Sequence, residues 1–234
     1  MKKLIRGLLA IAIVLVLMFA ATVVYVRDYY RAADDVDQLV SSLTLNIDQT
    51  DERTVLRPEA EKDLKTGIIF YPGGKVEAKA YLPLLIALVE KGYTCVLVEM
   101  PFNLAVFNAN AAQDIIPTLD GVDSWALMGH SLGGAMASSH MEKYASDFVG
   151  LILLAAYPLN DAEIPTLTLY GSEDTVVDPE KIGAVEDAIV IPGGNHGYFG
   201  NYGEQEGDGT ATITRAEQQA FTVDAIQAFL ESIK

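Results

Sequence analysis

The sequence is poor in the residue types that bind metals or form disulfides. Of 234 residues, one is a cysteine, Cys95, and three are histidines, so an intrachain disulfide is excluded. The H-E-x-x-H and C-x-x-C spacings that are typical of zinc sites do not occur. We therefore expect no metal and no other cofactor, and we expect Cys95 to be a buried packing residue in a strand.

Basic residues are also few. The chain has 16 lysines and arginines against 32 aspartates and glutamates. Four of the basic residues precede residue 28, so the rest of the chain has 12 basic and 32 acidic residues, a formal charge of −20. This balance argues against a nucleic acid partner, because phosphate binding needs basic patches. It also opposes contact with an anionic membrane surface.

Charge is absent from residues 7–26, a run of mostly apolar residues without a polar face. A helix of roughly 20 apolar residues spans the hydrocarbon core of a bilayer. Because Lys2, Lys3 and Arg6 precede the run and acidic residues follow it, we predict a cytoplasmic N-terminus and an extracytoplasmic remainder. No good cleavage site follows the run, so residues 1–27 are predicted to be a single-pass signal anchor in the cell membrane. A cleaved signal peptide and a secreted protein are the alternative.

The rest of the chain divides into a polar stalk with a leading strand, residues 28–52, and one domain, residues 53–234. In this domain apolar segments alternate with amphipathic ones, and the apolar segments lack the alternation of a half-exposed strand. That pattern is typical of an α/β fold, in which helices cover both faces of a mostly parallel sheet, here of about six to eight strands. The expected strands are residues 42–47, 53–57, 67–71, 93–100, 125–128, 149–157, 164–170 and 188–191.

Two of the expected helices of this domain differ in how strongly the sequence predicts them. A weak helix is predicted over residues 104–116. The final helix should begin at Thr214, where Glu217 completes a capping box. Its expected buried stripe comprises Phe221, Ala225, Phe229 and Ile233.

A G-x-S-x-G motif, Gly129-His130-Ser131-Leu132-Gly133, stands between an apolar run and a run of small helical residues. In this strand–turn–helix context, the turn lifts the serine hydroxyl out of the sheet next to the free N–H groups of a helix N-terminus. Glycines on both sides are needed because the strand and the helix come very close. Ser131 is therefore the candidate nucleophile. A helix-packing turn whose serine only caps the helix is the alternative.

A serine nucleophile needs a base, and the base needs an acid to orient it. His130 adjoins the serine along the backbone and His140 lies well inside the next helix, whereas His196 follows the last expected strand in a glycine-rich loop. By elimination, His196 is the candidate base. Asp174 follows the preceding strand and is the candidate acid, with Glu173 as a rival. Asp178 precedes a proline and is expected to cap a helix instead.

The oxyanion of an acyl-transfer reaction needs two N–H donors. The amide of Leu132, directly after the serine, is one candidate. The other should come from the loop Pro72-Gly73-Gly74-Lys75 after a neighbouring strand, and we favour Gly74. A plain tight turn is the alternative reading of this loop.

The order of Ser131, Asp174 and His196, the G-x-S-x-G motif and the P-G-G loop together resemble the α/β-hydrolase fold family. The segments Tyr71-Pro72-Gly73-Gly74-Lys75-Val76 and Asn195-His196-Gly197-Tyr198-Phe199-Gly200 look like a small bacterial, α/β-hydrolase-5-like subgroup near the dienelactone-hydrolase-like enzymes. The resemblance covers about residues 53–234 and implies a serine hydrolase. Pro72 stands where many members have histidine, and residues 158–165 leave no room for a cap.

The leading hypothesis is thus a carboxylesterase-like serine hydrolase that forms an acyl-enzyme on a small ester. The pocket is expected to be open and shallow, with substrate-binding side chains Lys75, Phe102, Leu104, Tyr198 and Phe199. We also expect an ion pair between Lys75 and Glu99 at its rim. An acyltransferase with the same three residues and a catalytically silent, anchored binding module remain as alternatives, and the sequence does not distinguish ester, lactone and thioester substrates.

Overall fold

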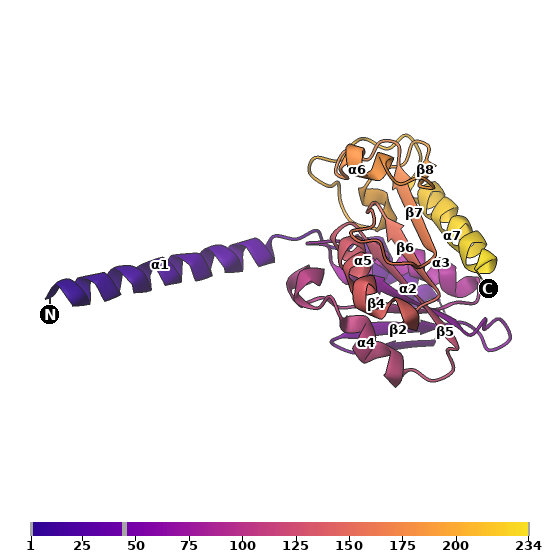
Figure 1. Cartoon of the computed structure of the whole chain (residues 1–234), viewed down its shortest axis with the longest axis horizontal. Coiled ribbons are helices and arrows are strands. Elements are labelled where there is room, and N and C mark those ends of the chain that lie inside the picture. The colour runs from indigo at the N-terminus through magenta and orange to yellow at the C-terminus, as the bar shows by residue number, and fades with distance from the viewer. Residues whose placement is uncertain (1, 44–45, 234) are drawn as a thin grey trace.

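The computed structural model describes residues 2–43 and 46–233. A long helix, α1 (Lys2–Arg27), extends away from the globular part of the chain (Figure 1). Within the described residues, α1 is the one helix that is long and apolar enough to cross a membrane, over Arg6–Arg27. The large apolar side chains in its middle are exposed to solvent, as expected of a helix without protein neighbours there.

The globular part is built on an eight-stranded sheet with the strand order β1-β2-β4-β3-β5-β6-β7-β8. Only β2 runs against the other strands, because it pairs antiparallel with both β1 and β4. The remaining pairs, from β4 to β8, are parallel. The predicted α/β fold with a mostly parallel sheet is therefore confirmed. The strands are β1 (Asn46–Gln49), β2 (Arg53–Arg57), β3 (Thr66–Tyr71), β4 (Thr94–Val98), β5 (Ser124–His130), β6 (Gly150–Leu154), β7 (Thr166–Gly171) and β8 (Ile189–Ile191).

Helices cover both faces of the sheet. One apolar core joins α2, α3 and α7 to the sheet, and a second joins α4 and α5 to its other face. In β3, Ile68 and Phe70 belong to the first core while Ile69 and Tyr71 belong to the second, so all four are buried. This is why the central strands are apolar throughout. The helices are α2 (Asp34–Ser42), α3 (Leu82–Glu90), α4 (Ala111–Ile115), α5 (Leu132–Tyr144), α6 (Pro179–Gly183) and α7 (Arg215–Ser232).

Three local predictions differ from the structure. Of the strand expected at residues 42–47, residues 44 and 45 lie outside the described residues, Ser42 ends α2, and the strand begins at Asn46. The helix expected over residues 104–116 is instead a short 3₁₀ turn, η3 (Ala105–Phe107), followed by α4, and another 3₁₀ turn, η2 (Pro101–Asn103), precedes it. The backbone is not helical at Leu104 (φ −133°, ψ 108°) or at Asn108 (φ −150°, ψ 51°), so a continuous helix does not form there.

The buried stripe of α7 differs from the prediction in part: Ala225, Phe229 and Ile233 are half-buried and pack against the first core. The capping box of Thr214 and Glu217 is present, but Phe221 is 41% exposed. The residues that α7 buries are Gln218, Gln219, Thr222, Val223, Ile226 and Leu230. Polar residues can face the core here because they have hydrogen-bond partners in it, and a search for apolar periodicity passes over them.

Candidate active site

The turn that carries Ser131 joins the end of β5 to the start of α5. Ser131 has φ 51° and ψ −119°, a conformation that costs a non-glycine residue on the order of 1–3 kcal/mol. A Cβ atom on Gly133 would overlap the carbonyl oxygens of Tyr71 and Pro72, and one on Gly129 would lie 2.5 Å from Gly133. The two glycines of the motif therefore let strand and helix approach closely enough to form this turn.

Asp174 and His196 are in contact although they follow different strands, β7 and β8. His196 Nδ1 lies 2.9 Å from Asp174 Oδ2, and the two side chains are 2% and 0% exposed. The other carboxylate oxygen, Oδ1, accepts hydrogen bonds from the amides of Val176 and Val177, both at 2.9 Å. An acceptor at Nδ1 keeps the proton on that nitrogen and leaves Nε2 able to accept a proton.

His196 and Ser131 line one pocket with a volume of about 340 Å³. The Nε2 atom of His196 is buried and has no hydrogen-bond partner among the residues that the structure describes. The remaining lining residues are Leu132, Ala135, Ala155, Ala156, Tyr157, Leu159, Val176, Val177 and Asp178. The pocket thus combines a hydroxyl, an imidazole and mainly apolar walls, which is an arrangement suited to acyl transfer.

The rival residues have structural partners elsewhere. The Asp178 carboxylate caps α6 by accepting from the amides of Glu180 and Lys181. Glu173 accepts a hydrogen bond from the hydroxyl of Ser172 at 2.9 Å. His140 Nδ1 lies 3.0 Å from the side-chain oxygen of Asn110, on the face of α5 that packs into the second core.

His130, next to the serine, belongs to a buried hydrogen-bond chain beneath the site. Its Nε2 lies 3.1 Å from the carbonyl oxygen of His196, an acceptor, so Nε2 carries the proton. Its Nδ1 therefore accepts from the Tyr81 hydroxyl at 2.7 Å, and that oxygen accepts from the Gly73 amide at 3.1 Å. Burial is the main cause that lowers the pKa of His130 well below its ordinary value. We refer to Gly73, Tyr81, His130 and the His196 carbonyl as the Tyr81–His130 chain. It joins the loop after β3 to the loop after β8 that carries His196, which we call the base loop.

The base loop has further polar supports that sequence reasoning missed. The Asp208 carboxylate accepts hydrogen bonds from the amides of His196, at 3.1 Å, and Gly197, at 2.8 Å. The Gln218 side chain accepts from the Asn195 amide at 2.9 Å and donates to the Asn195 carbonyl at 2.8 Å. The one sequence signal was a glutamine in the first turns of α7, where an apolar residue would otherwise face the core.

The loop after β3 brings Gly74 beside Leu132. A Cβ on Gly74 would lie 2.8 Å from Cδ2 of Leu132. The Gly73 amide donates to Tyr81 and the Lys75 amide donates to the Asn103 carbonyl at 2.8 Å. Neither the Gly74 amide nor the Leu132 amide has an acceptor within the described part of the chain, so both can donate to an oxyanion.

The side chains expected to bind substrate lie outside this pocket. Phe199 is fully buried with its ring 5.5 Å from that of His130, and Tyr198 lies under Arg215. Phe102 is 60% exposed and Leu104 is half-buried, both in the turns after β4. The remaining one, Lys75, is directed to the segment after α1.

The expected ion pair between Lys75 and Glu99 is wrong. Lys75 Nζ lies 2.9 Å from Asp28 Oδ2, and no ion pair joins it to Glu99 within residues 2–43 and 46–233. The reason is that the segment following α1 folds back onto the loop after β3 and supplies a nearer carboxylate. Burial raises the pKa of Glu99, and the neighbouring Glu77 raises it further.

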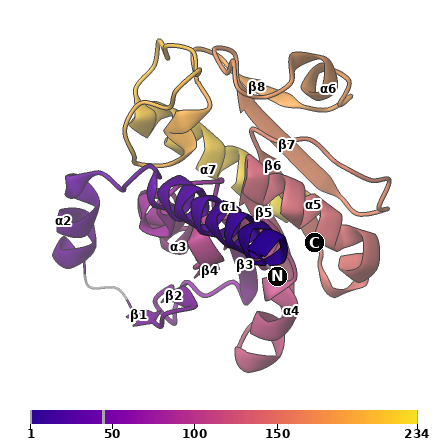
Figure 2. The same cartoon turned by 90° about the vertical axis from the view of Figure 1, so that its left-hand side faces the viewer.

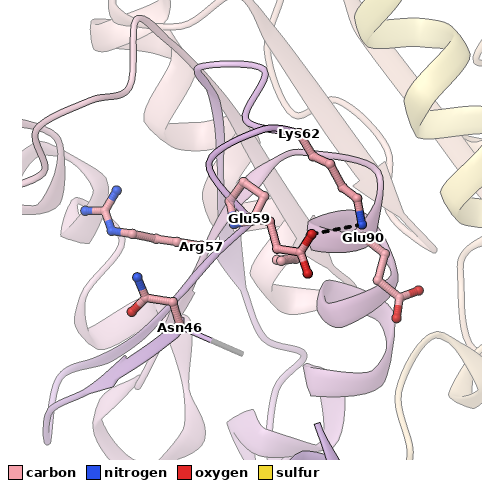
Figure 3. A pocket seen from close by; sticks show the side chains of 7 residues that line it. Asn46, Arg57, Glu59, Lys62 and Glu90 are labelled. Carbon is pink, nitrogen blue, oxygen red and sulfur yellow. Dashed lines mark ion pairs between the residues drawn. The ribbon is translucent and has the colours of Figure 1, made fainter. Parts of the chain in front are cut away.

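A second pocket of similar volume, about 370 Å³, lies at the edge where the parallel strands begin (Figure 3). It is lined by Asn46, Arg57, Pro58, Glu59, Lys62, Val89 and Glu90. Figure 3 shows Lys62 and Glu59 directed toward each other, and they form an ion pair at 3.4 Å. It contains neither a candidate nucleophile nor an imidazole, so the pocket with Ser131 is the better candidate site.

Solved structures of other proteins have a similar fold. Est1E from Butyrivibrio proteoclasticus is 15% identical with a TM-score of 0.56, covering 81% of this chain and 98% of its own. XC6422 from Xanthomonas campestris, described as an a/b serine hydrolase without lid, is 15% identical (TM-score 0.54; 79% and 94% covered). Naproxen esterase from Bacillus subtilis is 13% identical (TM-score 0.58; 83% and 95% covered). At these identities the likeness shows the fold alone.

Comparison with curated proteins found no match. The family model described as the alpha/beta hydrolase family matches residues 67–220, from β3 into α7 and across every element of the candidate site. On that match, and in agreement with the resemblance of its motifs, the chain belongs to the alpha/beta hydrolase family.

Proposed function

We propose that this member of the family is a serine hydrolase of carboxylic esters, with Ser131 as nucleophile, His196 as base and Asp174 as the acid that orients it. One observation carries the proposal. His196, whose Nδ1 lies 2.9 Å from the Asp174 carboxylate, lines the same pocket as a serine held at a strained backbone angle. A purely structural histidine would not need an unpartnered Nε2 in a pocket with such a serine.

The reaction follows from the proton acceptor at Nε2. His196 takes the proton of the Ser131 hydroxyl while the serine oxygen attacks the ester carbonyl carbon. The carbonyl oxygen then carries the negative charge, and the Leu132 and Gly74 amides donate to it. The carbon–oxygen bond to the alcohol breaks, and His196 gives its proton to the leaving alcohol. Water, deprotonated by the same nitrogen, then releases the acid from the acyl-enzyme and restores the serine.

The substrate is proposed to be an ester whose acyl group fits mainly apolar walls. One solved structure with this fold is described as an esterase, and another as a serine hydrolase without a lid. In this chain, too, only a short segment without helix or strand separates β6 from β7. An open pocket of about 340 Å³ suits an acyl chain that enters from the surface.

The cellular arrangement is proposed from α1. Residues 1–27 would form a single-pass anchor with its N-terminus in the cytoplasm, residues 28–52 would follow outside, and residues 53–234 would be the extracytoplasmic hydrolase domain. The length and composition of α1 support this proposal, as does the basic flank before it.

A covalent probe tests the proposed nucleophile. The full chain, purified in detergent, would be treated with a fluorophosphonate and its intact mass measured. We expect one adduct, which Ser131→Ala abolishes and His196→Ala strongly reduces, because the unassisted hydroxyl is a poor nucleophile. Ser232→Ala, at the exposed end of α7, is the matched control and should label normally. Folded wild-type protein without an adduct would refute the proposal.

A further inference from the structure

The turns between β4 and α4 carry three large apolar side chains that are open to solvent. Phe102, Val106 and Phe107 are 60%, 49% and 59% exposed, and the two phenylalanine rings meet edge to face at 5.6 Å. We call these three residues the apolar turns. The left-handed φ of 58° at Phe102 is rare for an aromatic residue. Clustered apolar groups of this kind mark a contact surface.

The apolar turns adjoin the last turns of α1. The 3₁₀ turn η2 contacts α1, and its Asn103 carbonyl accepts from the Lys75 amide at 2.8 Å. The Lys75 ammonium in turn lies 4.8 Å from the centre of the Tyr25 ring in α1. Figure 1 shows that α1 leaves the globular part on the side where the magenta turns before α4 lie. If α1 crosses a bilayer, the apolar turns therefore lie at the depth of its headgroups, where aromatic side chains are favoured.

The segment after α1 fixes the direction in which the globular part faces. The Tyr30 amide donates to the Lys75 carbonyl at 2.7 Å, and the Glu77 amide donates to the Tyr30 carbonyl at 2.9 Å. The Ala33 amide donates to the carbonyl of Asn201, beyond the base loop, at 2.9 Å. A segment bonded in this way to two loops of the site is not a free stalk. The segment therefore keeps one edge of the sheet, the edge at which the parallel strands end, turned toward the last residues of α1.

The candidate pocket opens at that same edge. The turn η3 contacts α5, whose first residue, Leu132, lines the pocket with Ser131. Two other lining residues, Leu159 and Val176, are 50% and 39% exposed. Figure 2 looks onto this edge with α1 directed at the viewer. The turns that carry the exposed apolar side chains thus contact both α1 and α5, and apolar side chains also line the pocket.

We propose that the apolar turns insert into the bilayer that α1 enters, and that the pocket receives the acyl chains of membrane lipids from it. This inference rests on the proposed function and narrows its substrate class to lipid esters. A lipid surface is the occupant because the surface is continuous with the one helix of the described chain that could span a membrane. The charge of −20 after residue 27 makes a zwitterionic lipid the better partner.

Insertion is measurable without any activity. In the full chain, Phe107→Cys would be labelled with an environment-sensitive nitrobenzoxadiazole dye and placed in phosphatidylcholine vesicles that contain nitroxide-labelled lipid. Phe221→Cys on α7 is the matched control, since Phe221 is also exposed but lies away from this edge. Cys95 should not react, because it is fully buried and burial raises the pKa of its thiol. We expect about threefold stronger quenching at residue 107 than at residue 221. Equal quenching at both would overturn the proposal.

Activity gives a second test. The double variant Val106→Ser, Phe107→Ser should lower kcat/KM at least about tenfold for a long-chain ester dissolved in the vesicles, because removing even one large apolar side chain from lipid has about this effect. For a water-soluble acetyl ester its kcat/KM should stay within about twofold of wild type. Phe221→Ser should change neither. An equal loss with both esters would mean damage to the fold, and no loss with either would mean no role; both results contradict the proposal.

The two proposals fail separately. Ser131→Ala should abolish hydrolysis of both esters and leave the quenching at residue 107 unchanged, because insertion does not involve the nucleophile. If Ser131→Ala keeps full activity, the proposed function is wrong while the quenching result still stands. If residue 107 is not quenched but Ser131 remains essential, the lipid inference is wrong and the proposed function stands.

Discussion

The two loops that meet at the candidate site are formed in opposite ways. The turn with Ser131 depends on its own motif, because Gly129 and Gly133 remove the side chains that would collide between β5 and α5. The base loop depends on residues far along the chain. Asp208 and Gln218 hold the backbone on both sides of His196, and the Tyr81–His130 chain holds its carbonyl. The turn with Ser131 is thus encoded locally, whereas the loop with His196 requires the assembled fold.

This comparison gives a graded set of expectations. A local change should act on the serine turn through steric overlap, whereas a change at a support of the base loop should act through unpaired polar groups. The first kind of damage is expected to exceed the second, because a backbone collision cannot be relieved by rotating a side chain.

The largest effect is expected from Gly133→Ala. The added methyl group would meet the carbonyl oxygens of Tyr71 and Pro72, so we expect a loss of about 3 kcal/mol or more in the free energy of unfolding. Urea denaturation of the full chain in detergent would measure it. Gly183→Ala on α6 is the control, since nothing lies within 4 Å of its Cβ, and it should be neutral or slightly stabilising. Similar losses for both variants would contradict the steric account.

Gln218→Ala should cost about 2 kcal/mol, because it leaves the buried amide and carbonyl of Asn195 without partners. Since the base loop then loosens, kcat should fall by about tenfold with little change in KM. The comparison variant is Gln227→Ala on the exposed face of the same helix, where the side chain bonds only Glu231 and the loss should stay below about 0.5 kcal/mol. A Gln218→Ala protein with wild-type kcat would show that the support is dispensable.

Tyr81→Phe removes one hydroxyl from the Tyr81–His130 chain. The Gly73 amide and His130 Nδ1 lose their partner, and we expect a loss of about 1.5 kcal/mol. Tyr93→Phe is a close control, because the Tyr93 hydroxyl is buried with no partner among the described residues, so its removal should be neutral or stabilising. Thermal unfolding of both variants measures the difference in stability, and equal shifts in Tm would count against a structural role of the Tyr81–His130 chain.

The smallest effect concerns pH. The folded pKa of His130 is well below its ordinary value, whereas the unfolded chain has the ordinary value of about 6.5. The unfolded chain therefore binds more protons than the folded one as the pH falls through 6.5, and stability declines; well above that pH the contribution is constant. Between pH 7 and 6 the decline should be about 0.7 kcal/mol from this residue. The wild type should lose that much more than His130→Gln over the same interval, and parallel losses would refute the assignment.

Much of the fold could be predicted from the sequence because its signals are local. Continuous apolar strands predicted the parallel sheet, and the G-x-S-x-G motif predicted the turn at Ser131. The contact of Asp174 with His196 could be anticipated from their order after two late strands, since loops at the ends of parallel strands meet at one edge.

What could not be predicted depends on which distant groups meet. Lys75 pairs with Asp28 because the segment after α1 folds back, a path that no periodicity in the sequence encodes. Gln218 faces the core because it forms two hydrogen bonds with Asn195, so a search for apolar residues misses it and includes the exposed Phe221 instead. Phe199 packs against His130 in the core, whereas its position in the sequence suggested a pocket wall.

The central claim is that Ser131, His196 and Asp174 act as one unit, and a mutant cycle on hydrolysis of a water-soluble acetyl ester tests it most directly. Ser131→Ala and His196→Ala should each lower kcat by about 10⁴-fold or more, and the double variant should be no slower than either single one. Asp174→Asn should add nothing to Ser131→Ala. The account would be contradicted if the losses in kcat of the single variants multiplied in the double variants. It would also be contradicted if Ser131→Ala hydrolysed the ester at the wild-type rate.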